Sequence, residues 1–249
     1  MKGLKRKVGI IIAAALCITL IGFMIYGYRV SRLYIDGQNI DNMFFGKFIK
    51  SISKILPIKT VKVDKVTIDK DKDGDGILDL EDIVQGARKD AANKPKYKSV
   101  YYNGGYPPDN EGVCTDVIWR SFKNAGYDLK KMIDDDIKNN VKEYSAVNGK
   151  PDPNIDFRRV KNLYVFFNKY ATKLTLELKP YDTENLKQWQ GGDIVIFKYP
   201  KEHVVIVSDK RRADGVPYII HNCSPYTMER NDLERWMPYI IGHFRYPNN

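Results

Sequence analysis

A thiol and two imidazoles are the side chains of this sequence best suited to covalent chemistry. Cys114 stands in the stretch GVCTDVIW, and the chain has only two other cysteines and three histidines. A cysteine becomes a good nucleophile beside a base, and imidazole is the usual base. Taken alone, Cys114 is a packed apolar side chain, one half of a disulfide or a nucleophile.

The segment that begins at Cys114 predicts a helix. Ile118, Phe122 and Ala125 fall on one stripe, and Gly126 supplies a C-terminal stop. Cys114 continues this stripe at the helix N-terminus, where unpaired N–H groups and the helix dipole stabilise a thiolate. The position therefore suits a nucleophile, although inert cysteines also begin helices.

Three short antiparallel strands are predicted further along, at residues 193–198, 203–208 and 217–222. His203 opens the second strand and His221 lies near the end of the third, so the two histidines are on adjacent strands. A cysteine at a helix N-terminus and a base on a strand, oriented by a second polar residue, form the layout that thiol catalysis needs.

Several motifs carry a resemblance to known bacterial families. They are, in chain order, YPPDNEGVCTDVIWRSFKNAGYDL, PDPNIDFRRVKNLYVFF, GGDIVIF, HVVIVSD, IIHN and GHFRYP. Their order resembles the NlpC-type, papain-like cell-wall cysteine peptidases and, more closely, the bacterial domain of unknown function 1287, over about residues 83–247. The resemblance implies an α+β, papain-like or NlpC-like fold, in which an N-terminal helix carrying the cysteine packs on a small antiparallel sheet.

The resemblance also implies catalytic roles. Cys114 attacks an acyl carbon, and its own backbone N–H is a candidate donor to the oxyanion. His203 takes the thiol proton and returns one to the leaving amine. His221 orients His203 because it shares the NlpC-type position, and Asn222 is the alternative, since only one of two neighbouring strand residues points into the site. His243 is interpreted as a satisfied strand histidine.

The sequence departs from the NlpC-type pattern around the cysteine. Those peptidases usually have Asp or Asn, then Cys, Ser and Gly, whereas residues 113–116 read Val, Cys, Thr and Asp. This leaves substrate recognition and the oxyanion site open. Asp116 either positions the helix or binds substrate. Arg158, with Arg159, could clamp a carboxylate, and Tyr106 could belong to an aromatic wall for the substrate. Surface charge and ordinary packing explain these residues equally well.

Residues 69–82 contain the spacing of an EF-hand-like calcium loop. Gly76 stands where such a loop turns sharply, and the predicted oxygen ligands are Asp71, Asp73, Asp75, the carbonyl of Ile77, Asp79 and Asp82. The twelfth position is Asp rather than Glu, as in dockerin-like and extracellular variants. A single loop predicts a structural calcium ion, and an acidic linker is the alternative. Asp82 is also expected to cap a helix that begins at Ile83.

Residues 1–30 predict a signal anchor, that is, an uncleaved transmembrane helix. Basic residues precede an uncharged apolar run from Val8 to about Tyr28, and roughly 20 such residues are enough to cross a bilayer. The basic flank predicts a single-pass protein of the cell membrane with its domain outside the cytoplasm. A cleaved signal peptide is the alternative. Residues 31–68 are interpreted as a stalk or linker.

The formal net charge of the chain is +10. In an exported domain this excess favours peptidoglycan or another anionic cell-wall polymer over nucleic acid as the partner. The features together predict a membrane-anchored, extracytoplasmic cysteine hydrolase, residues 83–249, that cleaves an amide bond in peptidoglycan peptides. A non-catalytic wall- or protein-binding module and a thioester-forming acyltransferase are the alternatives.

Two other uses of the cysteines compete with catalysis. A disulfide between Cys114 and Cys223 would silence the thiol in an oxidising compartment. A zinc site of these two cysteines with His203 and His221 has suitable ligand types, but the spacing matches no standard zinc motif. No organic cofactor is predicted.

Overall fold

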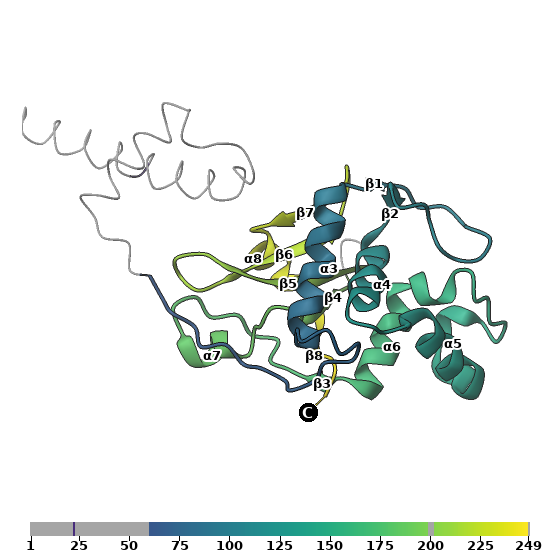
Figure 1. Ribbon diagram of the computed structural model, residues 1–249, viewed down its shortest axis with the longest axis horizontal. Helices are drawn as coiled ribbons and strands as arrows, with labels where there is room; N and C mark the ends of the chain where they lie inside the picture. The colour runs from purple at the N-terminus through teal and green to yellow at the C-terminus, as the bar shows by residue number, and fades with distance from the viewer. Residues whose placement is uncertain (1–21, 23–59, 199–201, 249) are drawn as a thin grey trace, which may run out of the picture. The chain divides into compact units, whose positions relative to one another are not determined.

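The computed structural model describes residues 22, 60–198 and 202–248 (Figure 1). The chain divides after Leu56 into two units, and the second, Pro57–Asn249, contains nearly all the described residues. Apart from Gly22, the predicted signal anchor lies outside the described residues, as does most of the predicted stalk. Within the described part of the chain, no helix combines the length and the apolar character needed to cross a bilayer.

The second unit is a mixed α+β domain. Its helices and strands are α3 Asp79–Asn93, β1 Lys96–Tyr97, β2 Glu111–Gly112, α4 Cys114–Asn124, α5 Leu129–Asn140, α6 Val160–Tyr170, β3 Thr172–Lys173, α7 Thr183–Lys187, β4 Ile194–Phe197, β5 His203–Arg211, β6 Pro217–Asn222, β7 Thr227–Arg230, α8 Leu233–Trp236 and β8 Ile240–Arg245. The α+β class and the helix that begins at Cys114 are as predicted.

The main sheet has six strands in the order β3-β8-β4-β5-β6-β7, and every neighbouring pair is antiparallel. The three predicted strands are β4, β5 and β6, which lie side by side. The prediction was incomplete, because β8 pairs with β4 and β7 pairs with β6. His203 begins β5 directly opposite Phe197 of β4.

The two faces of the sheet bury different cores, because successive residues of a strand point to opposite sides. Val204, Ile206 and Ile220 pack with α3, α4, α5 and α6 in the larger core. Val205 and Ile219 pack in a smaller core on the other face, together with Trp189 and Leu233. Figure 1 shows α3 and α4 lying together across the sheet.

Helices α3 and α4 approach each other closely at Gly86. A Cβ placed there would lie 2.7 Å from Cβ of Asn124 and 2.8 Å from Cα of Ser121, so only glycine permits this contact. The expected start of α3 at Ile83 with Asp82 as its cap is wrong, because α3 begins at Asp79 and Asp82 lies inside its first turn.

The last part of the predicted stalk packs on the domain. The Val61 N–H donates to the carbonyl of Ala213 over 2.8 Å, and the Gln190 side chain donates to the carbonyl of Asp64 over 3.1 Å. Ile68 is 4% exposed. Residues 60–68 are therefore held along the surface of the second unit.

Candidate functional site

Cys114 is the first residue of α4 and belongs to the larger core. Its side chain continues the apolar stripe of Ile118, as predicted, and is 7% exposed. Burial raises the pKa of the Cys114 thiol to about 12, while the backbone N–H groups of Val204 and Thr115 act in the opposite direction. The thiol thus lies against the start of β5 and is neutral at pH 7.

His203 and His221 form a hydrogen-bonded pair. Nε2 of His203 lies 2.7 Å from Nδ1 of His221. Trp236 stacks on the His203 ring, with centroids 4.8 Å apart and planes inclined by 18°. Burial lowers the pKa of His203 to about 4 and that of His221 well below its ordinary value. Both rings are therefore neutral at pH 7, so one nitrogen of the pair donates and the other accepts.

The thiol and the imidazole pair both lie at the start of β5, but on opposite faces of the strand. Cys114 contacts the backbone of Val204, whose side chain shares its core. The His203 side chain points to the other face, toward Trp236. Among the described residues, no hydrogen bond joins the Cys114 thiol to either imidazole. The predicted bond between base and orienting residue is present, and the one between nucleophile and base is not.

Cys223 is the thiol that approaches an imidazole. Its Sγ lies 3.8 Å from Nε2 of His221, and a carboxylate oxygen of Asp232 lies 4.0 Å from the same nitrogen. Sequence reasoning considered Cys223 only as a disulfide partner or a zinc ligand, although its position two residues after His221 places both on one face of the chain. Cys114 and Cys223 are both free thiols.

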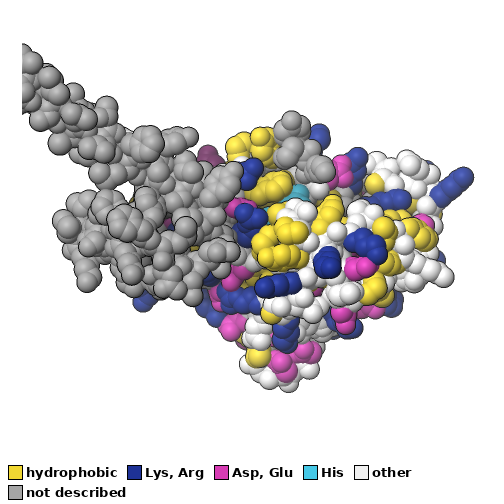
Figure 2. Space-filling view, turned by 90° about the horizontal axis from the view of Figure 1, so that it is seen from above, with side chains coloured by type: hydrophobic (Ala, Val, Ile, Leu, Met, Phe, Trp, Pro, Cys, Tyr) yellow, Lys and Arg dark blue, Asp and Glu magenta, His cyan; other side chains and the backbone are white. Residues whose placement is uncertain are grey.

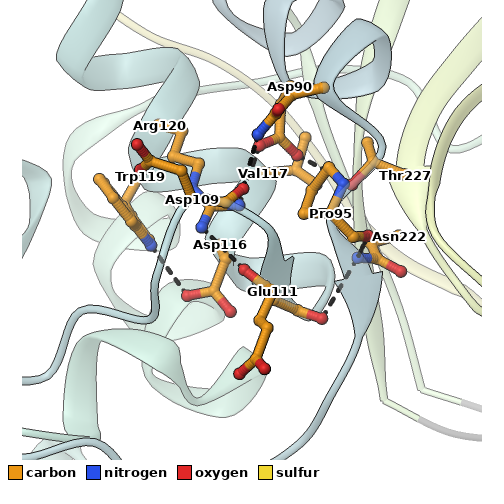
Figure 3. A network of polar contacts seen from close by, with 12 residues as sticks. Asp90, Pro95, Asp109, Glu111, Asp116, Val117, Trp119, Arg120, Asn222 and Thr227 are labelled. Carbon is orange, nitrogen blue, oxygen red and sulfur yellow. Dashed lines mark hydrogen bonds and ion pairs between the residues drawn. The ribbon is translucent and has the colours of Figure 1, made fainter.

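Asn222 lies on the face opposite to His221. Its side-chain amide donates to the carbonyls of Pro95, over 3.0 Å, and Gly112, over 3.2 Å. Figure 3 shows the side chain reaching from the sheet toward the segment that precedes α4. Its Oδ1 is buried and has no hydrogen-bond partner among the described residues. Asn222 thus anchors the residues before Cys114, while His221 pairs with His203.

Asp116 and Arg158 form a buried, bidentate ion pair. Arg158 donates through Nε, over 2.8 Å, and through its terminal nitrogen, over 2.9 Å, to the two carboxylate oxygens. Asp116 also accepts from the indole N–H of Trp119 and the backbone N–H of Val113, each over 2.8 Å. Each oxygen therefore accepts two hydrogen bonds. Such geometry positions the start of α4, and a role of the pair in substrate binding stays a prediction.

A second polar network ties the same helix to its neighbours (Figure 3). Arg120 donates to Asp90 of α3 over 2.9 Å and to the carbonyl of Glu111 over 2.8 Å. Thr227 of β7 donates to the other oxygen of Asp90 over 2.8 Å. Sequence reasoning did not find this network, because its members are far apart in the chain and have no characteristic spacing.

Tyr106 is 45% exposed and packs beside Trp119, with ring centroids 4.7 Å apart. It lines a shallow groove with Lys123 and Lys130. The space-filling view of Figure 2 shows lysines and arginines spread among hydrophobic side chains, with a small histidine surface. Of the three histidines, His203 keeps the largest exposure, 6%.

Among the described residues, the ligands of the alternative zinc site do not form a cluster, whereas part of the predicted calcium loop does. In the described part of the chain, the only group of three or more ligand-type side chains with all ligand atoms within 4.8 Å of one another is Asp71, Asp73 and Asp75. Asp79 is used by the protein itself, since it accepts hydrogen bonds from the Lys72 N–H, over 2.7 Å, and from the Tyr127 hydroxyl.

Comparison with known proteins identifies a family without a known activity. A family model described as domain of unknown function (DUF1287) matches residues 84–246. The chain is 34% identical over 172 residues, 66% of this chain and 80% of the relative, to the "Uncharacterized protein YijF" of Escherichia coli (strain K12). No solved structure gives a significant match. The chain therefore belongs to the DUF1287 family.

Proposed function

We propose that the protein is a membrane-anchored, extracytoplasmic cysteine hydrolase of papain-like, NlpC-like fold that cleaves an amide bond in peptidoglycan peptides. One observation carries the proposal: the hydrogen-bonded pair of His203 and His221 stands at the strand start that the Cys114 thiol contacts. A base held by a second polar residue near a cysteine at a helix N-terminus is the arrangement of thiol catalysis, and here the His203 ring must turn from the opposite face of β5 to reach the thiol.

The pairing of the histidines allows a tautomer that suits catalysis. If Nε2–H of His203 donates to Nδ1 of His221, then Nδ1 of His203 keeps a lone pair for the thiol proton. His221 then carries its own proton on Nε2, the nitrogen near Asp232. In this tautomer His203 is the general base and His221 orients it.

The reaction then proceeds through a thioester. Sγ of Cys114 attacks the amide carbon as its proton passes to Nδ1 of His203, and the Cys114 backbone N–H donates to the oxyanion. The C–N bond breaks as His203 protonates the leaving amine. Water, deprotonated by His203, then attacks the thioester, and the carboxylic acid and the free thiol are released.

The resting site does not hold a thiolate. The pKa of Cys114 is raised to about 12 and that of His203 is lowered to about 4, so proton transfer before substrate binds is strongly unfavourable. Proton transfer must therefore accompany attack on the carbonyl carbon, and the two side chains must first come within hydrogen-bond distance.

The state of the Cys114 thiol favours a second candidate function. A buried, neutral Cys114 without a hydrogen bond to an imidazole also fits a non-catalytic module that binds cell-wall polymer or protein on the same fold. The net charge of +10 supports an anionic wall polymer as the partner of either kind of protein. The N-terminal apolar segment supports attachment to the membrane in both cases.

The test is muropeptide release from purified peptidoglycan by the full-length chain in detergent. We expect the wild type to release peptides and Cys114→Ala to lower the rate by about 10³-fold or more. Cys17→Ala, which changes a thiol of the predicted anchor, is the matched control and should keep wild-type activity. If the wild type releases no peptides from several types of cell wall, the hydrolase proposal is excluded and the binding-module proposal is favoured. Equal activity of Cys114→Ala and the wild type would exclude Cys114 as the nucleophile.

A further inference from the structure

The segment 71–82 brings several oxygen donors together at one end of α3. Carboxylate oxygens of Asp71, Asp73 and Asp75 lie within 4.8 Å of one another. Gly74 and Gly76 have φ of 74° and 89°, in the left-handed region that favours glycine. Three exposed carboxylates are common on protein surfaces, so this cluster alone does not define a site.

The carboxylate of Asp82 is a second observation that points to a bound cation. Asp82 lies in the first turn of α3 and is 2% exposed. Its Oδ2 is buried and has no hydrogen-bond partner among the described residues, and its Oδ1 lies at 3.4 Å from the Asn124 amide. A buried carboxylate oxygen without a partner costs free energy, because water no longer solvates it.

Asp82 belongs to the same place as the exposed cluster. Its backbone carbonyl accepts a hydrogen bond from Asn124 over 2.9 Å. Two residues further on, a Cβ at Gly126 would lie 2.9 Å from Cβ of Asp73, so Asp82 contacts the last residue of α4 and Asp73 packs on the turn that follows it. Burial raises the pKa of Asp82 to about 6, with further contributions from the charges of Asp75 and Asp73.

We propose that this loop binds one calcium ion, with Asp82 as a buried ligand that completes the exposed carboxylate cluster. The ligands are the carboxylates of Asp71, Asp73, Asp75 and Asp82 and the backbone carbonyl of Ile77. A set of hard oxygen donors matches the preference of calcium. Asp79 is left out of this assignment, because it is buried and accepts from the Tyr127 hydroxyl, whereas the Asp71 carboxylate accepts from the backbone N–H groups of Gly74 and Gly76 inside the loop. The proposal does not depend on the hydrolase activity.

The test is calcium titration of the full-length chain after chelator treatment, by calorimetry and by thermal unfolding. We expect one ion per chain and a melting temperature that rises by several degrees, because calcium binds only the folded loop. Asp82→Asn should weaken calcium binding by about tenfold or more. The matched control is Asp69→Asn, which removes the same charge from an exposed position two residues before the first proposed ligand and should bind like the wild type.

Two outcomes would overturn the proposal. One is the absence of calcium binding by the wild type at millimolar calcium. The other is equal affinity of Asp82→Asn and the wild type, because the buried carboxylate is then not a ligand. Both measurements are made without substrate, so their outcome does not depend on the proposed hydrolase activity.

Discussion

Two buried aspartates occupy the first turns of two helices that touch, and their surroundings are opposite. Asp116 of α4 is completely buried, and its two oxygens accept four hydrogen bonds, two of them from the Arg158 guanidinium. Asp82 of α3 is 2% exposed, and one of its oxygens has no partner among the described residues. One carboxylate is satisfied by the protein, and the other is not.

The difference separates a positioning residue from a proposed ligand. A carboxylate with all its acceptor sites filled holds the structure around it and has little left to offer a bound molecule. A buried carboxylate with an empty acceptor site is destabilising until something occupies that site. The Asp116 carboxylate at the start of α4 is thus fully hydrogen-bonded, whereas Asp82 beside the loop 71–82 has a carboxylate oxygen without a partner among the described residues.

The largest expected effect is at the buried pair of Asp116 and Arg158. Asp116→Ala should lower the free energy of unfolding by about 3–5 kcal/mol, because it leaves Arg158 buried without its partner. Urea unfolding of the full-length chain measures this loss. Asp135→Ala is the control, since Asp135 pairs with Lys131 on the exposed surface of α5 and should cost less than about 0.5 kcal/mol. Equal losses of stability in the two variants would contradict the claim that the buried Asp116–Arg158 pair stabilises the start of α4.

An intermediate effect is expected from the histidine pair. The pKa of His203 in the folded chain is about 4, below the ordinary 6.5, so the unfolded chain binds more protons between these values. The contribution of His203 to the free energy of unfolding is therefore fully present above about pH 7. It is lost as the pH falls from 6.5 toward 4, and the loss is about 3 kcal/mol. His203→Gln should make the stability less dependent on pH in this window. Urea unfolding at several pH values measures it, and identical slopes for variant and wild type would contradict the burial of the ring.

The smallest effect is expected in the loop when calcium is absent. Asp73→Asn should change the free energy of unfolding by less than about 0.5 kcal/mol in chelator, because the side chain is exposed and lies among like charges. The measurement is chelator-treated thermal unfolding. A loss above about 2 kcal/mol would mean that the packing of Asp73 stabilises the loop without calcium. Asp73 and Asp116 would then both be structural residues.

Regular patterns in the sequence predicted the framework of the domain. The period of α4, the alternation in β4, β5 and β6, and the glycines of the loop are local signals, and the structure has these elements. The strand β7 was missed, and β8 was expected only as a strand around His243 without bounds, since TMER and IIGHFR lack a clean alternation of apolar and polar residues. The start of α3 was misplaced because Leu78, which has no capping side chain, precedes it.

The candidate site was harder to predict than the framework. His203 and His221 were expected to pair because they lie on adjacent strands, and the pair is present. The ion pair between Asp116 and Arg158 could not be foreseen, because the two are 42 positions apart and no spacing rule joins them. The approach of Cys223 to His221 follows from strand periodicity, but Cys223 was considered only as a disulfide partner or a zinc ligand.

The contact between Asn124 and Asp82 has an electrostatic consequence. Asn124 is the last residue of α4 and Cys114 is its first, so the loop and the thiol lie at opposite ends of one helix about 16 Å long. The C-terminal end of a helix carries partial negative charge and favours a cation, while the N-terminal end favours an anion, each by about 0.3–1 kcal/mol. A calcium ion in the loop and a thiolate formed at Cys114 during attack would therefore both be stabilised by the polarity that α4 already has.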